Sequence, residues 1–128
     1  MPWKVAPPGT NGGVSALGTL ASAAGGACMG LSHAFFLFPP SMGEILALTS
    51  VGLAAGLLGS MLDSFLGATV QATYYDTERK LVVKKPSRTT EHRGGVAILS
   101  NEAVNFVSTA AIALAAAMWP QVLLGWLA

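Results

Sequence analysis

A single carboxylate, Asp63, interrupts an otherwise apolar stretch of helix length that runs from Val51 to Thr73. Placing an ionised aspartate near the middle of a membrane-spanning helix costs roughly 2.5–3.5 kcal/mol, so such a side chain normally faces a protein interior, a water-filled cavity or a cation. Asp63 is therefore a candidate functional residue. The alternative is a packing role, in which the carboxylate pairs with a serine or asparagine across a helix interface.

A second polar group lies at the start of the last apolar stretch. Ser100 can cap a helix there, and Glu102 complements the helix dipole. Two amides and two hydroxyls then share one helical face: Asn101, Asn105, Ser108 and Thr109. Hydrogen bonds to a neighbouring helix would explain these four side chains, and so would a polar site that they line.

Glycines gather directly before the first apolar stretch, in the segment Thr10, Asn11, Gly12 and Gly13. This pattern predicts a turn that feeds a helix, with Thr10 or Asn11 as the N-cap. Backbone N–H groups could converge there at the positive end of the helix dipole, an arrangement that suits phosphate. The segment lacks the Lys-Ser/Thr ending of a Walker loop, and simple capping explains it equally well.

The only long polar segment, Tyr74 to Asn101, holds six of the seven basic residues: Arg79, Lys80, Lys84, Lys85, Arg88 and Arg93. A basic loop beside a bilayer usually fixes topology and touches anionic headgroups. The alternative is an electrostatic funnel that collects a phosphorylated substrate, in which Lys84, Lys85, Arg88 and Arg93 would attract the anion.

The elements that must position these residues are predicted from hydropathy. The chain is 52% hydrophobic and only 10% charged, with a mean hydropathy of +0.57, which is typical of a membrane protein. Three stretches lack charged residues except Asp63: Val14–Phe38, Ile45–Thr73 and Ala103–Ala128. Each exceeds the roughly 20 residues that cross a hydrocarbon core, so we expect three transmembrane helices in an all-α, single integral-membrane domain covering residues 1–128.

Smaller features complete this expected architecture. In the polar loop, Ala72–Tyr75 and Leu81–Lys85 flank a turn and predict a short β-hairpin. Pro120 is expected to kink or end the third helix. The pattern indicates a lipid bilayer and other membrane helices as partners, and no nucleic acid.

Small residues recur at a spacing of four on the first two predicted helices. The first carries Gly18, Ser22, Gly26 and Gly30, and the second carries Gly52, Gly56, Ser60 and Ser64. Such stripes allow two backbones to approach closely. Because only a short Pro-Pro turn separates these helices, we expect them to pack as an antiparallel pair.

The basic residues also predict the orientation of the chain. With three crossings, the polar loop and the N-terminus share one side, and that side holds all seven basic residues, including Lys4. The positive-inside rule then predicts that the N-terminus and the loop are cytoplasmic and that the C-terminus is outside or luminal.

Three segments carry a family resemblance: PGTNGGVS at 8–15, GSMLDSFLGATVQ at 59–71 and NEAVNF at 101–106. They resemble the signature blocks of transmembrane protein 19, the eukaryotic branch of the integral-membrane family called domain of unknown function 92. The resemblance covers nearly the whole chain. Members are generally longer, with further helices ahead of the first block, so this chain resembles their C-terminal portion. One departure is that Ser100-Asn101-Glu102 stands where an Asp-Asn-Asn run is common.

The resemblance implies a phosphotransferase, since plant and bacterial relatives are similar to isoprenoid-alcohol phosphate kinases, including phytyl-phosphate kinase. The wider group is similar to enzymes that use CTP, such as dolichol kinase. By this resemblance Asp63 would hold Mg²⁺ on the nucleotide phosphates, and Asn101 and Asn105 would orient them. Thr10, Asn11, Gly12 and Gly13 would cradle a phosphate. A different class of function stays open, namely a non-catalytic scaffold or subunit that packs against other membrane helices through its small-residue faces.

Overall fold

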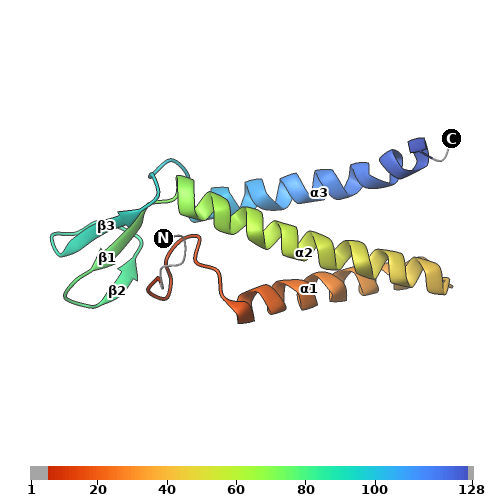
Figure 1. Ribbon diagram of the computed structural model, residues 1–128, viewed down its shortest axis with the longest axis horizontal. Helices are drawn as coiled ribbons and strands as arrows, with labels where there is room; N and C mark the ends of the chain where they lie inside the picture. The colour runs from red at the N-terminus through yellow and green to blue at the C-terminus, as the bar shows by residue number, and fades with distance from the viewer. Residues whose placement is uncertain (1–5, 127–128) are drawn as a thin grey trace. The chain divides into compact units, whose positions relative to one another are not determined.

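The computed structural model describes residues 6–126, with side chains up to Met118, so Lys4 lies outside the described residues. Three helices lie along this part of the chain (Figure 1): α1 (Ala16–Phe35), α2 (Met42–Val70) and α3 (Asn101–Trp126). Among the described residues, two segments are long and apolar enough to cross a membrane, namely α2 and the Asn101–Met118 part of α3. Crossing by α1 remains a prediction. Helix α3 runs past Pro120, so the proline does not end it.

The described residues fall into two compact units. The helix unit consists of Ser15–Met61 and residues 107–126, and therefore contains α1 and most of α2 and α3. The sheet unit consists of residues 6–14 and Leu62–Phe106, and therefore contains the end of α2, three strands and the start of α3.

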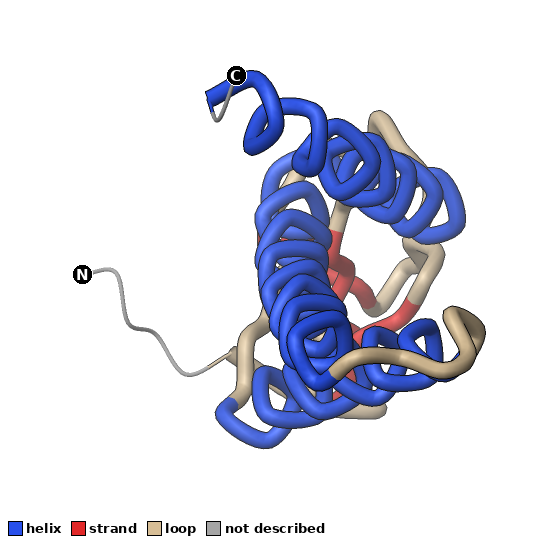
Figure 2. Tube along the Cα trace, turned by 90° about the vertical axis from the view of Figure 1, so that its right-hand side faces the viewer, coloured by secondary structure: helices blue, strands red, loops and turns tan. Residues whose placement is uncertain are grey.

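Within the helix unit, α1 and α2 pack through glycines, as the spacing predicted. A methyl group added to Gly26 would fall on the carbonyl oxygen of Gly52, and one added to Gly56 would fall on the carbonyl oxygen of Ser22. Gly30 lies equally close to the backbone of Leu48. The pairing order is antiparallel, and the two helices lie side by side in Figures 1 and 2. Gly18 does not take part in this contact, because an added Cβ there would meet only the Oγ of Ser15, the N-cap of its own helix.

The N-cap of α1 is Ser15, whose Oγ accepts a hydrogen bond of 3.1 Å from the N–H of Gly18. The prediction that Thr10 or Asn11 caps this helix is therefore wrong. The glycine segment forms a separate turn upstream of the helix, closed by the N–H of Gly13 donating to the carbonyl of Thr10 at 3.0 Å. The prediction for α3 is confirmed, because Ser100 Oγ accepts from the N–H of Ala103 at 3.2 Å.

The sheet unit contains β1 (Thr73–Asp76), β2 (Leu81–Val83) and β3 (Thr90–Gly94), drawn as red segments in Figure 2. The strand order is β2-β1-β3 and both pairings are antiparallel. The β1–β2 hairpin confirms the prediction, whereas the all-α description was wrong, because β3 completes a three-stranded sheet. Its sequence, TEHRG, lacks the alternation of apolar residues that predicts a strand.

Asp76 closes the β1–β2 turn. Its Oδ1 accepts hydrogen bonds from the N–H groups of Glu78 and Arg79, both at 3.0 Å, and its Oδ2 accepts from the hydroxyl of Thr89 at 3.2 Å. The side chain is buried, and its bonds, the one from Arg79 N–H foremost, hold the pKa of Asp76 below its ordinary value. This carboxylate therefore joins the hairpin to the loop before β3.

The segment after β3 caps the end of α2. The N–H of Val96 donates to the carbonyl of Thr69 at 2.9 Å, and the N–H groups of Ile98 and Leu99 donate to Val70 at 3.2 and 3.0 Å. These bonds satisfy carbonyls that a helix end leaves without a partner. Segment 96–99 is thus fixed against α2 immediately before α3 begins.

Candidate functional site: a polar groove in the sheet unit

The sheet unit contains a groove of about 560 Å³. Four segments of the chain form its walls: the N-terminal turn, the junction of α2 and β1, strand β2 with the following loop, and segment 97–102, which leads into α3. Its lining residues are Gly9, Asn11, Gln71, Ala72, Tyr74, Val82, Val83, Lys84, Lys85, Ala97, Ile98, Leu99, Ser100, Asn101 and Glu102.

Asn11 enters the groove from the N-terminal turn and is held by two hydrogen bonds. Its backbone N–H donates to Thr73 Oγ1 at 3.2 Å, and its side-chain amide donates to the carbonyl of Ala72 at 3.0 Å. The N–H of Gly13 is also engaged, with Thr10. Two of the N–H groups proposed to cradle a phosphate therefore donate to protein oxygen atoms, and the turn is anchored to the end of α2 and the start of β1.

The basic wall is made by Lys84 and Lys85, which follow β2 directly and are exposed. The other two basic residues expected to collect an anion do not line the groove. Arg88 lies further along the loop, and Arg93 pairs with Glu91 at 2.8 Å while its guanidinium lies 5.2 Å from the centre of the Tyr75 ring. Arg93 therefore acts in the packing of the sheet.

The start of α3 supplies Ser100, Asn101 and Glu102. Of the two asparagines predicted at this site, Asn101 lines the groove and Asn105, one turn further along α3, does not. Glu102 is the only carboxylate among the lining residues. The groove thus combines ammonium, amide, hydroxyl and carboxylate groups, a mixture that can bind a phosphate through charge and hydrogen bonds.

Asp63 does not line the groove. It is half-buried in α2, one helical turn before Gly67, and it interacts with other protein groups, as Asn105 does. Gly67 packs against the backbone nitrogen of Gly12, so the glycine turn and the Asp63 face of α2 lie close together. Among the described residues, no group of three or more His, Cys, Asp or Glu side chains is placed to hold a metal ion.

Sequence reasoning missed two polar side chains of the groove, Gln71 and Tyr74, together with its apolar lining. Gln71 is buried directly after α2, and the ring of Tyr74 lies 5.6 Å from that of His92. His92 is fixed in turn by a 2.8 Å bond between its Nε2 and the carbonyl of Gly95. The position of Gln71 and Tyr74 could have indicated a site, because a polar residue and an aromatic residue follow the end of a long apolar helix.

Comparison with known proteins identifies the family. A family model described as Integral membrane protein DUF92 matches residues 1–113. The chain belongs to this family. Among curated proteins, Protein PGR of Arabidopsis thaliana is 44% identical to this DUF92 protein over 106 residues, which cover 78% of this chain and 37% of the relative. The chain thus spans little more than a third of that relative and corresponds to its C-terminal part. No solved structure matches.

Family membership explains the exposed apolar surface of this DUF92 protein. Large hydrophobic side chains such as Leu17, Leu58 and Leu114 are exposed on α1, α2 and α3. In water this surface would be unfavourable, whereas a lipid bilayer solvates it. The predicted bilayer partner is therefore confirmed.

Proposed function

We propose that this DUF92 protein is a membrane phosphotransferase that moves a phosphoryl group from CTP to an isoprenoid phosphate such as phytyl or polyprenyl phosphate. The observation that supports the proposal is the groove, which gathers Lys84, Lys85, Asn11 and Asn101 from separate segments. Ammonium groups that attract an anion and amides that orient it are the groups that phosphoryl transfer needs, because catalysis there rests on positioning and charge stabilisation.

This reaction does not require a strong general base. An oxygen of the acceptor phosphate forms the new bond to the terminal phosphorus of CTP, the bond from that phosphorus to the bridging oxygen breaks, and CDP leaves. A phosphate dianion brings no proton to remove. A groove whose only carboxylate is Glu102 is therefore compatible with this reaction.

Mg²⁺ would neutralise charge on the nucleotide phosphates. In proteins it is commonly held by one or two carboxylates together with substrate phosphates and water. The chain offers Asp63 for this role. The Thr10–Gly13 turn packs near Gly67, which lies on the same face of α2 as Asp63, and Asn105 on α3 is a further oxygen donor. Oxygen donors of this kind fit a metal that is bound jointly with phosphate.

The test is transfer of radiolabel from CTP labelled in its terminal phosphate to phytyl phosphate, using the purified chain in lipid nanodiscs. We expect a Lys84→Gln/Lys85→Gln double variant to lose about tenfold or more of the activity. Lys80→Gln is the control, because it removes one positive charge in the β1–β2 turn outside the groove. Absence of transfer by the wild-type chain, with phytyl and polyprenyl phosphates both supplied, contradicts the proposal.

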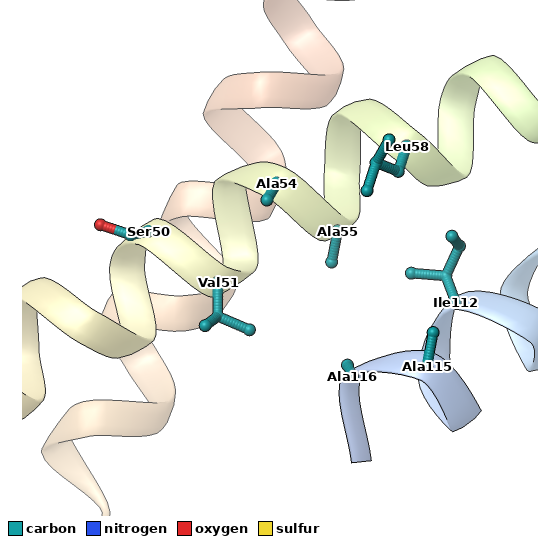
Figure 3. A pocket seen from close by; sticks show the side chains of 8 residues that line it. All are labelled: Ser50, Val51, Ala54, Ala55, Leu58, Ile112, Ala115 and Ala116. Atoms are coloured by element: carbon teal, nitrogen blue, oxygen red, sulfur yellow. The ribbon is translucent and has the colours of Figure 1, made fainter. Parts of the chain in front are cut away.

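A second candidate is a non-catalytic subunit that packs against another membrane helix. It is favoured by an apolar groove of about 370 Å³ between α2 and α3 in the helix unit, whose small side chains leave room for a partner (Figure 3). The lining residues are Ser50, Val51, Ala54, Ala55, Leu58, Ile112, Ala115 and Ala116. The glycine faces of α1 and α2 are already filled by each other, so they are not available to a partner.

Cross-linking would test this second candidate. A cysteine at Ala115, in a Cys28→Ser background, should give a cross-linked species of higher mass in native membranes if a helix occupies this groove. Ala54→Phe should then abolish the product. If the product forms equally with a cysteine at the exposed Leu114, the groove is not the binding surface.

A further inference from the structure

The polar groove of the sheet unit is also lined by apolar side chains, which form an apolar wall. Val82 and Val83 contribute to it from β2, and Ile98 and Leu99 contribute from the segment that caps α2. The side chain of Ile98 is 67% exposed although its backbone is fixed by hydrogen bonding to Val70. A rigid, exposed apolar surface beside two lysines suits an amphiphile better than a purely polar solute.

The charge of the groove limits the size of the anion. Its charged lining residues are Lys84, Lys85 and Glu102, which together leave a single net positive charge. A phosphate monoester carries about 1.5 to 2 negative charges at neutral pH, and each further phosphate of a nucleotide adds more. The positive charge of the groove therefore neutralises the charge of one phosphate group far better than that of a triphosphate.

The position of the groove along the helices supports the same occupant. Gln71 follows the last residue of α2, and Asn101 begins α3, and both line the groove. In a bilayer crossed by the two candidate spans, α2 and α3, these helix ends would lie near the lipid headgroups. The phosphate group of a lipid lies at the same depth in the bilayer.

We propose that this groove binds the phosphate end of a lipid monophosphate. Lys84, Lys85, Ser100 and Asn101 surround the phosphate, and the wall containing Ile98 contacts the first carbons of the chain. The nucleotide then binds elsewhere. This inference rests on the proposed function because it assigns the groove to the acceptor, although binding itself requires no transfer.

The experiment measures ligand binding to the full chain in nanodiscs with a zwitterionic lipid, by titration calorimetry. The ligands are dodecyl phosphate, inorganic phosphate, dodecanol and CTP. We expect dodecyl phosphate to bind at least tenfold more tightly than inorganic phosphate. Ile98→Ser should weaken the binding of dodecyl phosphate about tenfold and leave that of inorganic phosphate unchanged, whereas Lys84→Gln/Lys85→Gln should weaken both.

Two matched variants serve as controls. Leu81→Ser removes an exposed apolar side chain of β2 that does not line the groove, and Lys80→Gln removes a positive charge outside it. Equal binding of dodecyl phosphate and inorganic phosphate, or equal losses in the control variants, overturns the inference. So does tight binding of dodecanol, or CTP competing with dodecyl phosphate at this site.

The outcomes also separate this inference from the proposed function. If dodecyl phosphate binds as expected but no phosphoryl transfer occurs, the groove is a lipid phosphate site in a protein that is not a phosphotransferase. If transfer occurs and Ile98→Ser changes neither the binding nor the KM for the lipid, the proposed function stands and the assignment of the groove is wrong.

Discussion

The Cβ of Ala68 occupies the space where a side chain on Gly12 would begin. Gly12 and Ala68 are far apart in the sequence, and their contact packs the N-terminal turn against the last turns of α2. Gly12 also has a φ of +75°, a backbone conformation that residues other than glycine rarely adopt.

Gly12→Ala should therefore destabilise the protein by about 1–3 kcal/mol, through backbone strain and the collision with Ala68. Unfolding in detergent, followed by circular dichroism, gives the measurement. Gly25→Ala is the control, because nothing lies within 4 Å of a methyl group at Gly25. That variant should be neutral or gain up to about 1 kcal/mol from helix propensity. Equal stability of the two variants would show that the turn does not pack on α2.

Gly26→Leu and Gly56→Leu should each separate α1 from α2, because backbone atoms of the facing helix occupy the space a side chain needs. Overpacking of this kind costs typically about 1–3 kcal/mol. Thermal melts in detergent would measure it, with Gly25→Leu as the matched substitution on the open face of α1. Unchanged melting temperatures in the first two variants would refute the glycine contact.

Asp76 should make the stability of the sheet unit depend on pH. Its hydrogen bonds, the one from Arg79 N–H foremost, hold its pKa in the folded state below the ordinary value of 3.8. A lowered pKa means that the unfolded chain binds the proton more readily, so the carboxylate stabilises the fold above about pH 3.8, and this stabilisation is lost as the pH falls through the folded-state pKa.

Melting temperatures measured between pH 3 and pH 7 would test this dependence. Asp76→Asn should melt below the wild type at pH 7, and the difference should shrink as the pH falls below 4. Glu78→Gln, at an exposed neighbouring position, should follow the wild type throughout. A gap between Asp76→Asn and the wild type that stays constant with pH would contradict the linkage.

Asp63→Asn tests the proposed metal ligand. Asn is nearly isosteric with Asp, so insertion into the membrane should be preserved. If the Asp63 carboxylate holds Mg²⁺, the variant should lose the rise in melting temperature that Mg²⁺ and CTP together give the wild type. If Mg²⁺ and CTP raise the melting temperature equally in both proteins, Asp63 is a packing residue and does not bind the metal.

The loop between β2 and β3 is predicted to face the cytosol, because the basic residues gather in this part of the chain. A cysteine at the exposed Ser87, in a Cys28→Ser background, should react with an impermeant maleimide only after the cell membrane is permeabilised. Reaction of this cysteine on intact cells would contradict the predicted topology. A cysteine at Gly43, in the first turn of α2, should give the opposite result if α2 crosses the membrane.

Features that depend on local pattern could be predicted from the sequence. The four-residue spacing of Gly26, Gly30, Gly52 and Gly56 predicted the α1–α2 pair, and Ser100 was found as a cap because its hydroxyl acts within one turn. The expected orientation placed Asn11, Asn101 and the two lysines on the same side of the membrane, but it did not distinguish Asn101, which lines the groove, from Asp63 and Asn105, which do not. For these residues the sequence separation matters little once the helices are known.

The remaining features depend on pairings that a single sequence does not encode locally. Strand β3 forms because Tyr74 and Tyr75 pair with His92 and Glu91, although its own residues are polar. Ser15, rather than Thr10 or Asn11, caps α1 because the glycine turn is anchored to Thr73, 62 positions away from Asn11. Gln71 and Tyr74 join the groove only after the sheet folds back on the end of α2.

The glycine contact between α1 and α2 has a thermodynamic consequence. Its residues have almost no side chain to bury, so its attraction comes from van der Waals packing between backbones and not from apolar surface removed from water. The change in heat capacity on unfolding scales mainly with apolar surface, so separating these helices should contribute little to it. The enthalpy and the entropy of separating the two helices should then be nearly constant, so the free energy of the contact should change almost linearly with temperature, without the curvature that burial of apolar surface produces.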